Sequence, residues 1–172
     1  VLFVAGVLVK PQMLIFGPIL LVAYVKDIVE QPRQGWKDLG VSVLAGVGTL
    51  VLIALPFTIK QNPAWLIDKY TSAAGLYPYA TVNAFNIYAL FGGNWVSDST
   101  EVFLGISIKT LGTLFIVAVC ILGGYLYWRS KERKAIVPVS AIVVWGIICF
   151  AQNMHERYLF PAALLFLVAY IL

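Results

Sequence analysis

Long runs of apolar residues, separated by short polar clusters, dominate the pattern of the chain. A bilayer core needs about 20 apolar residues per helix, and unpaired backbone groups are too costly in hydrocarbon for open, irregular structure. The pattern therefore predicts an all-α fold: a polytopic transmembrane helix bundle with a long external loop, forming one transmembrane region over residues 1–172. The expected spans are residues 1–9 (incomplete), 13–25, 40–59, 103–128, 135–151 and 158–172.

Basic residues in two polar clusters predict the orientation of these spans. The segment "RSKERK" at 129–134 carries four basic residues, and the segment 26–39 carries three. Lys and Arg are enriched in cytoplasmic loops beside spans, so both segments are predicted to be cytoplasmic linkers. An even number of spans separates them, so the two assignments agree. The segment 60–102 then forms a long external loop, on the same face as Lys10 and residues 155–157.

The composition is typical of a membrane protein and disfavours a soluble domain, a nucleic-acid-binding protein and a disulfide-rich protein. Of the 172 residues, 61% are hydrophobic and 12% are charged, about half the charged fraction of a typical soluble domain. Basic residues beside spans set topology, so the net charge of +4 does not indicate a nucleic-acid partner. Cys120 and Cys149 lie inside apolar runs, which disfavours a disulfide framework or a thiolate metal site. No cofactor is expected.

Both ends of the chain lie inside apolar runs. The first residue is Val1 rather than methionine, and no polar flank follows Leu172. We therefore expect the sequence to be a piece of a longer membrane protein, to which any function would belong. Its oligomeric state is left open.

The segment "QNMHERYLFP" at 152–161 contains the one histidine of the chain. Asn153 and Glu156 have the spacing of a helix-capping box, but a cap requires neither His155 nor Arg157. A helix N-terminus already favours an anion, and a guanidinium grips phosphate oxygens with two donors. The segment predicts a phosphate site; the alternative is a polar patch that anchors the helix at the interface. With a lone histidine and few carboxylates nearby, no metal is expected.

Lys10 lies in "VLVKPQMLIFGPILL", between two apolar runs. Ionisable groups at membrane depth are costly and normally face a polar cavity or a partner. Lys10 therefore either lines a pocket for an anion, together with Gln12, or extends from a helix end to the surface. Residues 1–25 are either two short spans or one helix kinked at Pro11, and both versions leave Lys10 near the external surface.

The external loop is rich in aromatic residues, and its part "YPYATVNAFNIYALFGGNW" at 77–95 combines them with asparagines. The pattern predicts a turn at Pro78, then a short amphipathic helix that ends at Gly92. Asn83 and Asn86 would share one face of that helix. Rings that stack on sugar C–H groups and amides that pair with hydroxyls suit sugar recognition. A structural helix lying in the membrane surface would have a similar pattern.

Three segments together, "KPQMLIFGPIL", "YPYATVNAFNIYALFGGNW" and above all "NMHERYLFPAALL", resemble the later half of polytopic C-type glycosyltransferases. These enzymes use a polyprenyl-phosphate sugar as donor and include relatives of protein O-mannosyltransferases and of lipid-linked-oligosaccharide glucosyltransferases. The resemblance covers most of the chain, from Val1 to about Ala169. It implies transfer of a mannose-type or glucose-type hexose on the non-cytoplasmic face, in a cell-envelope pathway of a bacterial inner or plasma membrane.

The resemblance also implies roles for particular residues. It assigns to the lipid phosphate and donor Lys10, Gln12, His155, Glu156, Arg157 and Tyr158. It assigns to the sugar or acceptor loop Tyr79, Asn83, Asn86 and Trp95. The catalytic acid of this family lies in the first external loop, for which this chain has no matching region. Asp68, Asp98 and Glu101 are external acids in other contexts, so no catalytic residue is assigned.

Other functions fit the same pattern. A transporter or flippase of a lipid-linked anionic substrate would use the same cations, although such proteins often have two related halves and none are visible here. A non-catalytic membrane assembly subunit would tolerate alanine at His155 and Arg157. A polymerase or ligase acting on undecaprenyl-linked glycans is the nearest enzymatic alternative.

Overall fold

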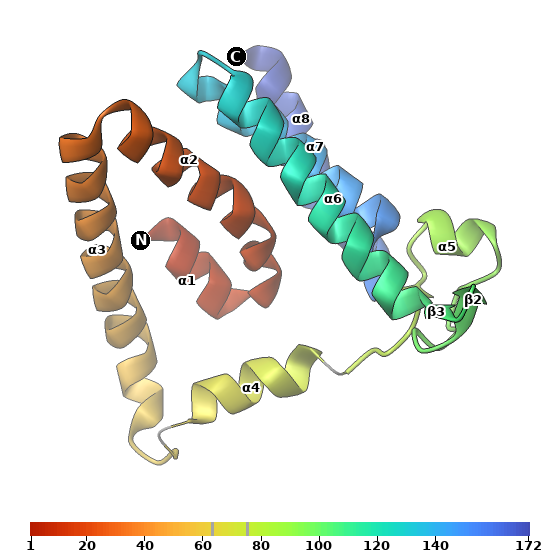
Figure 1. Cartoon of the computed structure of the whole chain (residues 1–172). Helices are drawn as coiled ribbons and strands as arrows, with labels where there is room; N and C mark the ends of the chain where they lie inside the picture. The colour runs from red at the N-terminus through yellow and green to blue at the C-terminus, as the bar shows by residue number, and fades with distance from the viewer. Residues whose placement is uncertain (63, 75) are drawn as a thin grey trace. The chain divides into compact units, whose positions relative to one another are not determined.

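The computed structural model describes residues 1–62, 64–74 and 76–172. Helices make up 74% of the structure, and the described residues form eight α-helices. The chain divides into two compact units, Val1–Leu76 and Tyr77–Leu172. Figure 1 shows the course of the chain through the two units.

The first unit consists of helices that follow one another with short breaks. Helix α1 (Leu2–Val9) ends at Lys10, whose backbone is extended, and a 3-10 helix η1 (Pro11–Phe16) leads into α2 (Gly17–Glu30). Proline lacks an amide hydrogen and cannot continue the preceding helix, which explains the break. Helices α3 (Pro32–Thr58) and α4 (Trp65–Ala74) complete the unit.

Helices α2 and α3 form a tight hairpin. The segment 26–39, expected as a linker, is helical except at Gln31, so the helices extend further than the polar cluster indicated. Pro32 lies in the first turn of α3, where proline is well tolerated. A Cβ at Gly35 would lie 2.6 Å from the backbone nitrogen of Ile28, so only glycine fits at this crossing.

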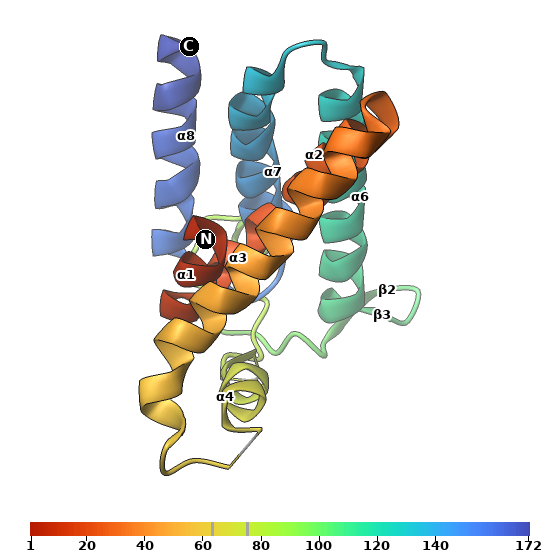
Figure 2. The same ribbon diagram turned by 90° about the vertical axis from the view of Figure 1, so that its left-hand side faces the viewer.

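The second unit is built on α6 (Ile108–Arg129), α7 (Ile136–Phe150) and α8 (Phe160–Ile171). Figure 2 shows the three helices side by side. The short 3-10 helix η2 (Arg133–Ala135) joins α6 to α7. Helix α7 is the most buried, and its Val143 and Val144 are almost fully enclosed. A Cβ at Gly146 would lie 2.9 Å from a methyl group of Val119, so α6 and α7 pack closely there.

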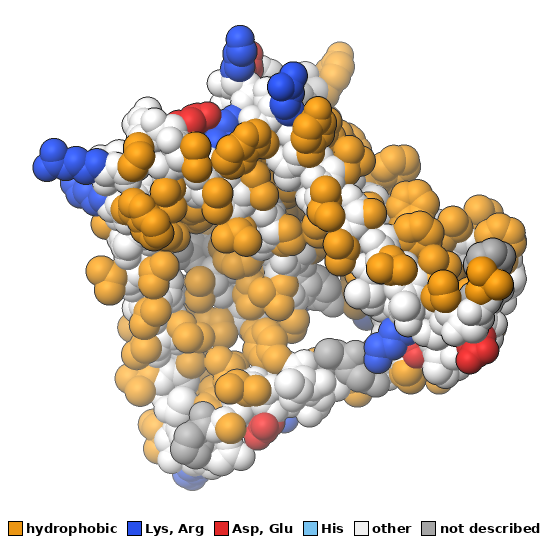
Figure 3. Space-filling view, viewed as in Figure 1, with side chains coloured by type: hydrophobic (Ala, Val, Ile, Leu, Met, Phe, Trp, Pro, Cys, Tyr) orange, Lys and Arg blue, Asp and Glu red, His pale blue; other side chains and the backbone are white. Residues whose placement is uncertain are grey.

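Among the residues that the structure describes, four helical stretches are long and apolar enough to cross a membrane: Pro11–Glu30, Pro32–Thr58, Ile108–Arg129 and Arg133–Phe150. The expectation of a mostly helical chain with several membrane-length apolar helices is confirmed at this level. Helices α1 and α8, in the outermost expected spans, are shorter. Figure 3 shows apolar side chains along α3 and basic side chains gathered near the α2–α3 turn.

The second unit also contains small β elements that the sequence did not indicate. Strand β1 (Thr81–Val82) pairs in parallel with β4 (Met154–His155), and β2 (Glu101–Phe103) pairs antiparallel with β3 (Ile106–Ser107). The short helix α5 (Ile87–Leu90) lies between β1 and β2 in the sequence. The expected loop 60–102 therefore holds α4 in the first unit and folded structure in the second.

Candidate functional site

Pairing of β1 with β4 joins the loop after Leu76 to the segment that contains the histidine. Val82 pairs with His155, and Asn83 forms a further bridge to His155. The amide of Asn153 donates to the carbonyl of Tyr79 at 3.0 Å. Two segments that the sequence singled out separately therefore lie next to each other in the folded unit.

Asn83 is the centre of a cluster of amides and aromatic rings. Its amide N–H donates to Asn94 Oδ1 at 2.8 Å, and its Oδ1 accepts from Asn94 Nδ2 at 3.2 Å and from Trp95 Nε1 at 3.1 Å. The Trp95 ring meets the Tyr79 ring edge-on, with centroids 5.2 Å apart. Three of the four residues assigned to the sugar loop thus come together. Asn94 is a fourth member, which the sequence analysis did not single out.

Two backbone conformations in this cluster are unusual. Asn83 and Trp95 have φ angles of 56° and 60°, in the left-handed region. Asparagine adopts this region more readily than most residues, whereas for a bulky tryptophan it is a real outlier. Such strain costs on the order of 1–3 kcal/mol and tends to occur at functional sites. The outlier at Trp95 marks the cluster as a candidate binding surface.

Asn86 lies apart from this cluster and supports the fold. Its Oδ1 accepts from the amides of Tyr88 and Ala89, and its Nδ2 donates to the carbonyl of Ala151 at 3.1 Å. The expected amphipathic helix bearing Asn83 and Asn86 on one face is wrong. Helix α5 has four residues, Asn86 is its N-cap, and Asn83 precedes it in a β-bridge.

His155 lies between two tyrosine rings and is 6% exposed. Its ring meets Tyr77 edge-on at 4.8 Å and Tyr158 at 5.1 Å between centroids. Burial and the neighbouring Arg157 charge lower the pKa of His155, while Glu156 acts in the opposite direction. The imidazole is therefore neutral at pH 7. Among the residues that the structure describes, none hydrogen-bonds to the imidazole nitrogens.

Arg157 and Glu156 are exposed beside the histidine. The guanidinium carbon of Arg157 lies 6.0 Å from the centroid of the Tyr158 ring, at the outer limit for a cation–π contact. Arg157 therefore presents a charged, planar donor group at the surface, next to a neutral imidazole. This pair can hold an anion with several oxygen atoms, such as a phosphate.

The expected capping box at Asn153 and Glu156 is wrong. Asn153 has a φ of 61°, and its buried Oδ1 has no hydrogen-bond partner in the described part of the chain. Glu156 begins the 3-10 helix η3 (Glu156–Leu159), whose N-cap is His155 without a side-chain cap. Helix α8 begins at Phe160, so the histidine lies ahead of its N-terminus. Strand pairing of residues 154–155 takes the place of the expected cap.

Lys10 and Gln12 belong to the first unit. Lys10 is exposed at the junction of α1 and η1, and its carbonyl accepts from the amide of Met13 at 3.0 Å. Both side chains lie where Pro11 interrupts the helix, as expected for a locally polar bend. A joint role of Lys10 with His155 remains a prediction.

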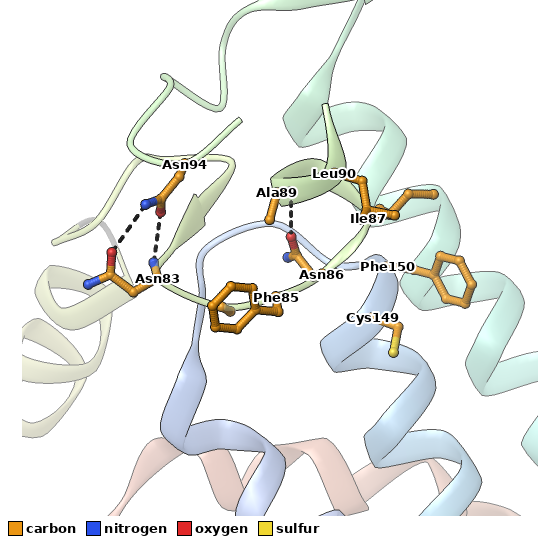
Figure 4. A pocket seen from close by; sticks show the side chains of 10 residues that line it. Asn83, Phe85, Asn86, Ile87, Ala89, Leu90, Asn94, Cys149 and Phe150 are labelled. Carbon is orange, nitrogen blue, oxygen red and sulfur yellow. Dashed lines mark hydrogen bonds between the residues drawn. The ribbon is translucent and has the colours of Figure 1, made fainter. Parts of the chain in front are cut away.

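A pocket of about 570 Å³ opens beside the Asn83 cluster. Figure 4 shows Asn83 and Asn94 at one side and the Cys149 and Phe150 side chains, from the end of α7, at another. Most of the lining is apolar. The described residues contain no group of three or more His, Cys, Asp or Glu side chains that could hold a metal ion. Asp98, one of the acids expected to be external, is buried outside this pocket.

Comparison with known proteins gives no relative to guide the assignment. No protein-family model matches the chain, and no curated protein and no solved structure is significantly similar to it.

Proposed function

We propose that the chain is part of an integral-membrane glycosyltransferase, which moves a mannose-type or glucose-type hexose from a polyprenyl-phosphate sugar to an acceptor on the non-cytoplasmic face. The observation that carries this proposal is the pairing of β1 with β4. It sets the His155–Arg157 pair beside the Asn83 cluster, so one surface combines groups for an anion with groups for a sugar.

The chemistry of the reaction explains the need for the first set of groups. Transfer of a sugar from a lipid phosphate leaves negative charge on the phosphate, and donors aimed at that charge lower the barrier. In the proposed enzyme, the Arg157 guanidinium contacts the phosphate oxygens and the neutral His155 donates one N–H beside it. Tyr158 positions both, since its ring touches the imidazole and lies near the guanidinium.

The second set of groups suits the sugar. In the proposal the exposed faces of Tyr79 and Trp95 pack on sugar C–H groups, and the Asn83–Asn94 amides pair with hydroxyls. Asn86 supports the loop and does not contact the sugar in this proposal, because its side-chain amide already caps α5 and bonds to Ala151. Glu156 adjusts the charge around His155, because its carboxylate opposes the lowering of the His155 pKa.

The four membrane-length helices among the described residues support placement of the chain in a membrane. In the proposal they cross the bilayer, with the basic segment 129–134 in the cytoplasm and the His155 site at the opposite surface. A bacterial inner or plasma membrane and an undecaprenyl-type donor are the setting that the sequence resemblance favours.

The experiment is a transfer assay on the protein in membranes that are supplied with a radiolabelled polyprenyl-phosphate hexose. Arg157→Ala and His155→Ala are expected to lower transfer by roughly 100-fold, the usual effect of removing a group that stabilises developing charge. Lys131→Ala, which removes an exposed charge from the opposite end of α6, serves as the matched control and should keep full transfer. If a variant that combines Arg157→Ala with His155→Ala folds and transfers sugar at the wild-type rate, the proposal is wrong and an assembly role gains support.

A further inference from the structure

The segment 84–93, which we call the α5 turn, exposes several large apolar side chains of the second unit. Its sequence "AFNIYALFGG" contains no charged residue. Phe85 is 97% exposed, Leu90 81% and Phe91 84%. Isolated exposed apolar residues are normal on protein surfaces, but several large ones on one short turn indicate a surface that something covers.

Polar side chains of the α5 turn are satisfied inside the protein. Asn86 uses its oxygen to accept from two amides and its nitrogen to donate to Ala151. The Tyr88 hydroxyl donates to the carbonyl of Phe150 at 3.0 Å. The turn therefore needs no water for these groups, although its apolar side chains point outward.

Backbone amides of the turn are also paired within the turn. The amides of Phe91 and Gly93 donate to the carbonyl of Tyr88, and the amide of Gly92 donates to Ala89. A Cβ at Gly93 would lie 2.8 Å from the Tyr88 carbonyl oxygen, so glycine is required for this close return. Internal pairing of this kind is what a segment exposed to hydrocarbon requires, because lipid offers no hydrogen bonds.

The turn lies beside the beginning of α6. A groove of about 530 Å³ is lined by Tyr88 and Phe91 from the turn and by Leu111 and Phe115 from the helix. At about 1.5 Å per residue, Leu111 and Phe115 lie about 5 Å and about 10 Å along α6 from Ile108. Lys109, in the first turn of α6, marks the polar end of the helix. The α5 turn thus sits level with the first apolar turns of a membrane-length helix, as Figure 1 also shows.

We propose that the α5 turn is embedded in the bilayer and that an acyl chain of a membrane phospholipid occupies the groove between α5 and α6. The inference rests on the part of the proposed function that lets α6 cross the membrane. A lipid chain is the chosen occupant because Leu111 and Phe115, which line the groove, belong to the membrane-length helix α6, on which Leu114 is also exposed. The exposed Ser97, Ser99 and Glu101 of the neighbouring segment remain in water in this proposal.

The test measures how close single positions lie to lipid chains. The full chain, with Cys120→Ala and Cys149→Ala, is reconstituted in phosphatidylcholine–phosphatidylglycerol vesicles, and one cysteine at a time is labelled with a fluorophore. Leu90→Cys and Phe91→Cys report on the turn, Leu114→Cys reports on α6, and Ser99→Cys is the exposed polar control. Quenching by phosphatidylcholine that carries a nitroxide on its acyl chain is compared with quenching by aqueous iodide.

We expect fluorophores at positions 90 and 91 to be quenched by the nitroxide lipid as strongly as a fluorophore at position 114. Iodide should quench all three at least fivefold more weakly than it quenches a fluorophore at position 99. If Leu114 is quenched by lipid but Leu90 and Phe91 behave as Ser99 does, the inference is overturned while membrane crossing stands. Protection of Leu90 and Phe91 from both quenchers would mean that protein covers the turn, which also overturns the inference. Failure at Leu114 would overturn both the inference and the membrane placement on which it rests.

Discussion

The hydroxyl of Tyr70 donates a hydrogen bond of 2.7 Å to the carbonyl of Val7. In a continuous helix this carbonyl would accept from the amide four residues later, but that residue is Pro11, which has no amide hydrogen. Tyr70, in α4, therefore donates the hydrogen bond that Pro11 cannot donate. It ties α4 to α1 inside the first unit, where both helices line an apolar pocket of about 380 Å³.

Tyr70→Phe is expected to destabilise the first unit by about 1 kcal/mol, the usual net value of one hydrogen bond, because the Val7 carbonyl would lose its donor. Denaturant unfolding in detergent measures the change. Tyr170→Phe removes a hydroxyl from a highly exposed tyrosine and is the matched control, with no expected effect. Equal stability of the two variants would show that the Tyr70 bond contributes nothing.

Asn86→Ala is expected to lower the free energy of unfolding by about 2–3 kcal/mol, because a helix cap and a buried bond to Ala151 are both lost. Asn94→Ala, on the exposed side of the Asn83 cluster, should cost less than about 1 kcal/mol. Thermal unfolding of the two variants compares them directly. A larger loss at Asn94 than at Asn86 would contradict the assignment of Asn86 to structural support.

Gly112→Ala is expected to destabilise the second unit, because a Cβ at this position would overlap the side-chain oxygen of Gln152 and approach its backbone nitrogen to 3.0 Å. The cost of such overpacking is about 1–3 kcal/mol. Gly48→Ala in α3 has open space around the new methyl group and should be neutral or stabilising, by up to about 1 kcal/mol of helix propensity. Opposite signs in the two melting temperatures are the expected result.

We expect the pKa of His155 to lie below the usual histidine value near 6.5, since burial and the Arg157 charge both lower it. Between the folded and unfolded pKa values the unfolded chain binds more protons. The contribution of His155 to stability is therefore complete above about pH 6.5 and is lost as the pH falls through the folded pKa. Isotope-labelled histidine gives one NMR signal, because the chain has one histidine.

Two variants check the causes of this shift. Arg157→Ala should raise the pKa of His155, because a neighbouring positive charge is removed, and Glu156→Gln should lower it further. Addition of a polyprenyl phosphate should raise it in the wild type if the phosphate binds beside the imidazole. A folded protein whose histidine titrates at or above 6.5 without ligand would contradict the burial of this ring.

The helices could be predicted from the sequence because long apolar runs allow little else in a membrane. The residues at which the helices begin and end were harder to predict from the sequence. The charges between residues 26 and 39 suggested a linker, but a turn at Gln31 alone is enough to reverse the chain. Polar residues at the end of a helix can remain helical at the membrane surface, so charge marks the interface better than it marks the helix end.

The contacts within the candidate site were only partly accessible from the sequence. The resemblance assigned Tyr79, Asn83 and Trp95 to one loop, and the structure shows these residues in contact. Their link to His155 depends on a pair of two-residue strands, which have too few residues to leave an alternating pattern. The same pairing places Asn153 in a left-handed conformation, which local capping rules could not anticipate.

The β1–β4 pair has a consequence for the order in which the protein is made. Thr81 and the carbonyl of Met154, which lie in hydrogen-bonding range, are 73 residues apart in the chain. A ribosome therefore releases the loop with Asn83 and Trp95 long before the strand that completes it, with α6 and α7 synthesised in between. His155 and the Asn83 cluster can therefore meet only after α6 and α7 have been made, so the β1–β4 pair cannot form while the loop alone has left the ribosome.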